Sequence, residues 1–215
     1  MSSINDLILV IFVLTNFSLL GASQMGACVR LSAAQGMLLC PLPLLLPQDG
    51  FSLRSLLFAV GLFAVKGIVF PRLLFRTLRT VNIRHEVEPF VGYTASLLAG
   101  IGILALSLWV AGGLQLPTSQ QLSPLVLPIA LSTILTGLFL IVGRRKALMQ
   151  VVGYLVMENG IYIFGIAVAQ EVPFLVETGI LLDVFVAVFL MGIAIFHINR
   201  QFDHIDVEKL TSLKD

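Results

Sequence analysis

The chain has 215 residues, of which 58% are hydrophobic and 12% are charged, and its mean hydropathy is +1.01. A soluble domain has about 45–50% apolar and about 25% charged residues, so this composition excludes a soluble globule, a disordered tail and a coiled coil. The formal net charge of +1 indicates no nucleic-acid partner. Composition therefore predicts a polytopic membrane protein, in which the few charged residues are the informative ones.

Seven stretches are apolar enough for a transmembrane helix, which needs about 20 residues. They are 4–26, 31–46, 53–75, 90–113, 122–142, 147–169 and 174–198. The second is short and ends at Pro41 and Pro43, because proline removes a backbone donor. The third is expected to continue beyond the lipid as an amphipathic helix, since Arg72, Arg76 and Arg79 recur at helical spacing. The predicted fold class is all-α with about seven transmembrane helices.

The basic residues orient these helices. Eleven of the 13 Lys and Arg fall on one side, namely Arg30, Arg72, Arg76, Arg79, Arg84, Arg144, Arg145, Lys146, Arg200, Lys209 and Lys214. Only Arg54 falls on the other side, and Lys66 lies within a stretch. The positive-inside rule places the N-terminus outside and the C-terminus in the cytoplasm. The first stretch lacks a basic n-region, so we expect a retained helix.

Three ionisable residues fall inside these stretches: Lys66, Glu158 and Asp183. Each costs at least about 2.5–3.5 kcal/mol at the centre of a bilayer, and such residues usually face a bundle interior or a wet cavity. At about 1.5 Å per residue, Glu158 lies about 15 Å from the cytoplasmic side and Asp183 about 13 Å from the outer side. Lys66 comes out within about one helical turn of the same plane. We therefore expect a central polar layer that links the three residues directly, through water or through partner subunits.

Polar neighbours of Glu158 are candidates for supporting proton transfer. Tyr154, Glu158 and Tyr162 follow one another at four-residue spacing, so they form a slowly winding stripe along their helix. Asn159 directly follows Glu158 and is a further candidate. A tyrosine hydroxyl can bind a carboxyl group, and a stripe of such groups favours ordered water.

Three other positions could extend the polar layer. Pro71 lacks an N–H, so the Gly67 carbonyl loses its usual helical partner and can help to solvate the Lys66 ammonium or a water. Glu177 lies near the outer end of the last stretch and His197 near its inner end. For both, a solvated position at the interface is the alternative to a place in the proton path.

A relay and a static ion pair are both open interpretations of the three charges. A static pair would need one carboxylate per lysine, whereas two carboxylates are present. Buried acids and bases that exchange protons suit a relay. Asn16, in contrast, is interpreted as a hydrogen-bonding contact between helices.

No cofactor site is visible. The three histidines are scattered, and Cys28 and Cys40 have a spacing that suits neither zinc nor an Fe–S cluster, so we expect two buried, unreactive thiols. We also find no nucleophile–base pair and no phosphate-binding loop. The chain is therefore expected to have no active site and no cofactor of its own.

Four stretches resemble component E of hydrogenase-4. They are FAVKGIVFPRLL (63–74), GYLVMENGIYIFG (153–165), LVETGILLDVFVAVFL (175–190) and DVEKLTSLKD (206–215). The similarity extends over about 1–215, and MENG followed by ETG and Asp183 is its most specific part. This family belongs to the membrane part of formate hydrogenlyase-type, group 4 NiFe-hydrogenase complexes.

The resemblance implies partners and a location. The partners would be antiporter-like and quinone-site-like membrane subunits, together with peripheral hydrogenase subunits that hold the NiFe centre and the Fe–S clusters. The location would be the bacterial or archaeal cytoplasmic (inner) membrane. The resemblance also implies that Lys66 belongs to the family's lysine-bearing span.

The last three stretches are similar to the K-type subunit of respiratory complex I and the C-type subunit of Na⁺/H⁺ antiporters. Arg144 and Arg145 precede a span with the buried Glu158, and Asp183 follows in the next span. In that family such acids belong to a hydrophilic axis that carries protons. Glu158 lies about one helical turn from the equivalent position and the second acid is Asp rather than Glu, so the role transfers better than the geometry. The resemblance divides the chain into a four-helix region, 1–121, and a three-helix region with a short cytoplasmic tail, 122–215.

Together these features predict a non-catalytic membrane subunit of a group 4 hydrogenase or complex-I-like oxidoreductase. It would contribute to a mid-membrane proton path along Lys66, Glu158 and Asp183, and to assembly of the membrane arm. The alternatives are a subunit of a cation/proton antiporter-type complex, a pure scaffold and a stand-alone secondary transporter. A stand-alone transporter often has internal repeats and broken helices, and neither is clear here.

Overall fold

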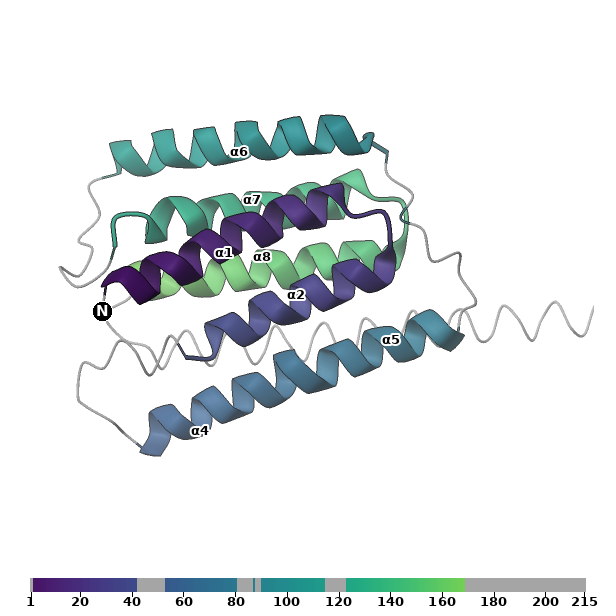
Figure 1. The fold of residues 1–215 in the computed structure, drawn as a ribbon, viewed down its shortest axis with the longest axis horizontal. Coiled ribbons are helices and arrows are strands. Elements are labelled where there is room, and N and C mark those ends of the chain that lie inside the picture. The colour runs from purple at the N-terminus through teal and green to yellow at the C-terminus, as the bar shows by residue number, and fades with distance from the viewer. Residues whose placement is uncertain (1, 42–52, 81–86, 88–89, 115–122, 169–215) are drawn as a thin grey trace, which may run out of the picture.

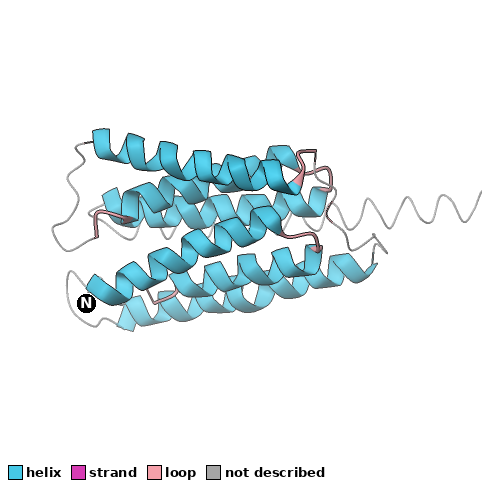
Figure 2. Cartoon of the chain, turned by 45° about the horizontal axis from the view of Figure 1, so that its top comes forward, coloured by secondary structure: helices cyan, strands magenta, loops and turns pink. Residues whose placement is uncertain are grey.

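The computed structural model describes residues 2–41, 53–80, 87, 90–114 and 123–168, and every regular element in these parts is a helix (Figures 1 and 2). The first helices are α1 (Ser2–Gly21) and α2 (Met25–Leu39). A continuous helical rod follows, made of α4 (Leu53–Leu62), η1 (Phe63–Val69) and α5 (Phe70–Thr80). The last described helices are α6 (Tyr93–Gly113), α7 (Val126–Gly143) and α8 (Ala147–Val168). The all-helical prediction is confirmed for the described residues.

The first two helices meet earlier in the chain than the apolar stretches indicate. α1 ends at Gly21 and α2 begins at Met25, ahead of the predicted stretch at 31–46. Arg30, which was expected in a loop, therefore lies within α2, with its side chain exposed. A helix can extend past the lipid as long as its charged side chains reach water, so hydropathy alone places this boundary too late.

The third predicted helix continues beyond its apolar part, as the arginine spacing indicates. α5 runs to Thr80, and its Arg72, Arg76 and Arg79 are exposed while Leu74 and Leu78 are buried. α6, α7 and α8 agree with the predicted stretches to within a few residues. The predicted helix at 174–198 lies outside the described residues.

Glycines hold α7 and α8 in direct backbone contact. A Cβ at Gly137 would lie 2.6 Å from the Gly153 carbonyl oxygen, and one at Gly160 would lie 2.6 Å from the Ile134 nitrogen. These distances leave no room for a side chain, so the α7–α8 pair depends on all three glycines, as small residues do in membrane helix packing.

Three helices are long and apolar enough to cross a membrane: α6, α7 and α8 over Tyr93–Gly113, Val126–Gly143 and Ala147–Gly165. α6 lies on the outside of the bundle, where it contacts α1 and α7 (Figure 1). Its large side chains point outward, and Trp109 is 78% exposed. Such an apolar surface is suited to contact with lipid. The three helices indicate that the chain is a membrane protein.

Seven of the nine described Lys and Arg residues lie toward one end of the bundle, and Arg54 and Lys66 are the other two. At this end α1 turns into α2, α5 ends and α7 turns into α8 (Figure 1). The Val87 N–H donates to the Ser23 carbonyl, and the Phe90 N–H donates to the Gly143 carbonyl, so the segment before α6 closes the same end. We call it the basic end; it carries Arg30, Arg72, Arg76, Arg79, Arg144, Arg145 and Lys146.

Candidate functional site

An ion pair lies buried between the rod and α8. Lys66 Nζ of η1 lies 2.6 Å from Glu158 Oε1 of α8, and the two side chains are 5% and 3% exposed. The Lys66 ammonium also donates to Asn159 Oδ1 at 2.9 Å. Lys66 and Glu158 thus lie at one depth, as the span lengths predicted. We call Lys66, Glu158 and Asn159 the ionic centre.

A turn of π-helix presents Lys66 to α8. Over Phe63–Val69 the backbone bonds run from residue i to i+5, and the Phe70 N–H donates to the Val65 carbonyl. The next donor in this pattern would be Pro71, which has no N–H to offer the Lys66 carbonyl. The lost bond therefore falls at the Lys66 carbonyl, one residue before the Gly67 carbonyl that i+4 spacing predicts. Wide turns of this kind are rare and occur often at functional sites.

Gly36 of α2 provides the space for the Lys66 stem. A Cβ at Gly36 would lie 2.9 Å from Lys66 Cβ and 3.3 Å from its Cδ. The rod can therefore approach α2 only because residue 36 has no side chain. The same contact holds the lysine between α2 and α8.

The ionic centre keeps one unused acceptor. Glu158 Oε2 is buried and has no hydrogen-bond partner among the described residues. A buried ion pair is stable only with good geometry and further hydrogen bonds, and Lys66 donates one to Asn159 Oδ1. The nitrogen–oxygen distance of 2.6 Å is also within the range in which a proton passes between an acid and a base.

A second, uncharged polar cluster joins α1, α2 and α7. Asn16 donates to Thr133 Oγ1 at 2.9 Å, which supports the interpretation of Asn16 as a contact between helices. The Gln35 amide donates to both Thr15 Oγ1 and Asn16 Oδ1 at 2.8 Å. We call Thr15, Asn16, Gln35 and Thr133 the amide cluster. Sequence reasoning missed Gln35 and Thr133, although an uncharged amide within an apolar stretch, just before Gly36, was a usable signal for Gln35.

The turn between α7 and α8 buries Arg144, one of the basic residues assigned to the cytoplasmic side. Arg144 is 1% exposed, and its Nη2 donates to the Leu20 carbonyl at 2.8 Å. Its guanidinium lies 5.7 Å from the centre of the Tyr93 ring, and burial lowers the pKa of Arg144 below its usual value. Arg144 thus links the α1–α2 turn to the α7–α8 turn, in addition to its place among the basic residues that orient the helices in the membrane.

Known proteins similar to this chain include two kinds of relative. The uncharacterized protein Rv0085 of Mycobacterium tuberculosis is 30% identical over 221 residues, which cover all of both chains. Hydrogenase-4 component E of Escherichia coli K12 is 31% identical over 161 residues, or 75% of this chain and 74% of the relative. No protein-family model and no solved structure matches the chain.

The chain belongs to the hydrogenase-4 component E family.

Some predicted residues of this component E homologue lie outside the described part. Asp183, Glu177 and His197 fall there, so the structure brings together two of the three predicted path residues, Lys66 and Glu158. Asn159, a predicted supporting residue, joins them.

The two predicted tyrosines of this family member lie on α8 with different surroundings. Tyr162 is 6% exposed and packs in an apolar cluster with residues such as Phe12 and Leu39. Tyr154 is half-buried and packs against the larger apolar cluster. Neither replaces Asn159 as the acceptor for the Lys66 ammonium beside Glu158.

The metals that the hydrogenase resemblance implies find no ligand set in the described part of this component E homologue. No three His, Cys, Asp or Glu side chains gather there. Cys28 of α2 and Cys40, which directly follows α2, are free and buried, about 18 Å apart along the helix axis at about 1.5 Å per residue.

Proposed function

We propose that the chain is a non-catalytic membrane subunit of a hydrogenase complex, and that Lys66, Glu158 and Asp183 carry protons at mid-membrane. Membership in the component E family supports the place in the complex. The ionic centre carries the proposed mechanism, because a lysine and a glutamate 2.6 Å apart lie buried in a bundle whose other buried side chains are mostly apolar.

The pair can hold a proton in two arrangements without changing its net charge. In one, Lys66 is an ammonium and Glu158 a carboxylate; in the other, both are neutral. The low dielectric of the interior penalises isolated charges, and proton transfer within the pair creates none. A proton that reaches Lys66 can move on to Glu158, and Glu158 Oε2 is the free atom from which it can leave. Asn159 holds the ammonium in place during the exchange.

The surrounding arrangement is part of the proposal. We propose seven transmembrane helices in the bacterial or archaeal cytoplasmic membrane, with the basic end in the cytoplasm and the N-terminus outside. Residues 122–215 would serve as a K-type-like unit and residues 1–121 as a four-helix region that adds Lys66. The partners would be antiporter-like, quinone-site-like and peripheral subunits of a formate hydrogenlyase-type complex, with the NiFe and Fe–S groups in the peripheral ones. Charge changes in those partners during electron transfer would bias the protonation of the ionic centre.

Substitutions that keep the shape of the acids test the relay. Glu158→Gln and Asp183→Asn are introduced into the assembled complex, and proton uptake by inside-out membrane vesicles is followed together with redox turnover. We expect proton uptake to fall by about 10²-fold or more, the scale of a lost acid–base group. Ser107→Ala on α6 is the matched control, because its buried hydroxyl only donates to the Ile103 carbonyl of its own helix. Proton uptake and turnover equal to the parent in both acid variants would remove the relay.

A scaffold is the second candidate, and the Lys66–Asn159 bond favours it, since a well-bonded ion pair can simply join two helices. In that case Glu158→Gln would lower the amount of assembled complex, and the turnover of each assembled complex would stay unchanged. Quantifying the complex by native gel electrophoresis, alongside its proton uptake, separates the two roles.

A further inference from the structure

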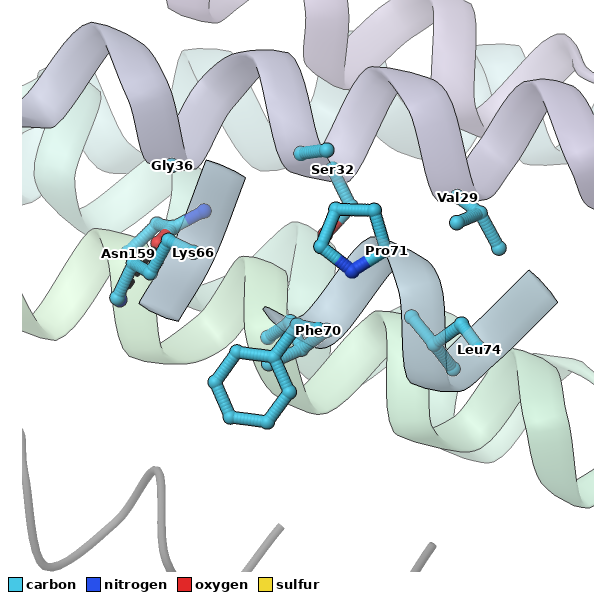
Figure 3. Close-up of a pocket in the computed structure, with 10 residues that line it drawn as sticks. Val29, Ser32, Gly36, Lys66, Phe70, Pro71, Leu74 and Asn159 are labelled. Atoms are coloured by element: carbon cyan, nitrogen blue, oxygen red, sulfur yellow. Dashed lines mark hydrogen bonds between the residues drawn. The ribbon is translucent and has the colours of Figure 1, made fainter. Parts of the chain in front are cut away.

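A small cavity adjoins the ionic centre. It lies between α2, the rod and α8, and the side chains of Ser32, Lys66 and Asn159 line its polar part (Figure 3). Val29 and Leu74 line its apolar part (Figure 3). The space amounts to about 10 Å³ for the centre of a water molecule. A single buried water needs about 10–15 Å³ on this measure.

The polar lining offers enough partners for one water. The Lys66 ammonium has three donors, of which Glu158 and Asn159 take two. The Ser32 hydroxyl is both an acceptor and a donor. A buried water typically makes two to four hydrogen bonds, and these groups meet that need.

The cavity leads from the ionic centre toward the basic end. α2 begins at that end, so Gly36, Ser32 and Val29 approach it in that order. The rod ends there, so Leu74 lies closer to it than Lys66. The lining residues of α2 and of the rod thus extend in the same direction, and those of α2 span about 10 Å of the bundle between residues 36 and 29 at about 1.5 Å per residue.

We propose that this cavity binds a water that exchanges protons between Lys66 and the basic end, and that the Ser32 hydroxyl holds this water by a hydrogen bond. The inference rests on the proposed relay and adds the route by which Lys66 gains its proton. In the exchange, a proton arrives on the water from the basic end, and the water gives one of its own protons to a neutral Lys66 amine. One O–H bond breaks and one N–H bond forms, so the water is unchanged and the lysine becomes an ammonium. The ammonium then passes a proton to Glu158, which is a carboxylate at this point because its previous proton has left from Oε2.

Two substitutions at Ser32 separate the hydroxyl from the space. Ser32→Ala removes the hydroxyl but leaves room for water, and we expect proton uptake by vesicles of the assembled complex to fall by about two- to threefold. Ser32→Val removes the hydroxyl and fills the space, and we expect a fall on the order of tenfold or more. Ser107→Val is the control, because Ser107 is equally buried but does not line the cavity. Equal proton uptake in Ser32→Ala, Ser32→Val and the parent would overturn the proposal.

A direct view of the water provides the second readout. In a cryo-electron microscopy map of the assembled complex that resolves buried waters, we expect density within hydrogen-bonding distance of Ser32 Oγ and Lys66 Nζ, and its loss in Ser32→Val. A map that resolves other buried waters but none at this position would overturn the water site even if Ser32→Val assembles poorly. If Glu158→Gln blocks uptake and both Ser32 variants are normal, the access route is wrong and the relay stands. If Glu158→Gln has no effect, the relay itself fails, and water density at Ser32 would then support a bound water without a role in transport.

Discussion

The ionic centre and the amide cluster are both buried polar contacts between helices, yet they differ in what their unused atoms can do. The amide cluster leaves Gln35 Oε1 without a partner among the described residues, and the ionic centre leaves Glu158 Oε2. An amide oxygen stays neutral at any ordinary pH, whereas a carboxylate oxygen can take up a proton. The comparison teaches that burial and hydrogen bonding alone do not indicate function in a membrane bundle. A buried group that can gain or lose a proton is the better indicator of function.

The largest expected effect comes from removing one charge of the ionic centre. Lys66→Met leaves Glu158 buried without its cation, and we expect about 3–5 kcal/mol less stability, the usual result of breaking a buried pair. The double variant Lys66→Met with Glu158→Gln removes both charges, and we expect it to regain most of that loss. Unfolding by sodium dodecyl sulfate in mixed micelles measures both. A double variant as unstable as Lys66→Met would show that the pair's charges are not what stabilises this contact.

The next effect is at Asn159. Asn159→Leu keeps the volume roughly constant but removes the acceptor for the Lys66 ammonium, and we expect about 1.5–3 kcal/mol of destabilisation because the lost bond involves a charge. The same unfolding assay gives the number, and vesicle proton uptake shows whether the ammonium must be held for the exchange. Asn159→Asp is the informative companion, since it retains an oxygen for Lys66 and adds a second carboxylate. Wild-type stability in Asn159→Leu would mean that Asn159 does not hold Lys66 in the membrane.

The amide cluster should respond more weakly and without loss of function. Asn16→Leu removes the bond to Thr133 and one acceptor of Gln35, and interhelical bonds of this kind contribute about 0.6–1.7 kcal/mol. We expect a loss in this range, together with proton uptake per assembled complex equal to the parent. A clear fall in uptake at unchanged assembly would end the distinction between the two clusters and place Asn16 in the proton path.

The sequence predicted the helices well wherever hydrophobicity decides their limits, and less well where the limits depend on turns. α7 and α8 follow their apolar stretches closely, because lipid and packing act on the whole segment. The turn between α1 and α2 carries no proline, and the short break after Gly21 does not interrupt the apolar stretch at 4–26, so the start of α2 at Met25 was missed.

The candidate site was predictable in its charges but not in its details. The shared depth of Lys66 and Glu158 follows from helix rise, and the contact between them agrees with it. The π-turn at Phe63–Val69 was not predicted, because hydropathy does not distinguish i+4 from i+5 bonding and only Pro71 indicated an irregularity. The burial of Arg144 was not predicted either. A charged side chain is expected in water unless its hydrogen-bond partner is known, and here the partner is the Leu20 carbonyl, which is distant in sequence.

The smallest expected change in stability, and the sharpest test of the comparison, is at Gly36, which adjoins both regions. Gly36→Ala places a Cβ 2.9 Å from Lys66 Cβ, an overpacked contact that costs about 1–3 kcal/mol, while alanine returns about 1 kcal/mol of helix propensity. The net loss should be about 1 kcal/mol, but the lysine must shift relative to Glu158. Gly61→Ala on α4 is the matched control, because nothing lies within 4 Å of its Cβ, and it should be neutral or slightly stabilising. If the position of Lys66 governs proton transfer, Gly36→Ala slows proton uptake far more than it destabilises the fold, whereas Gly61→Ala changes neither. If uptake falls only in proportion to the assembled protein, the ionic centre behaves as a static contact like the amide cluster, and its charges serve assembly alone.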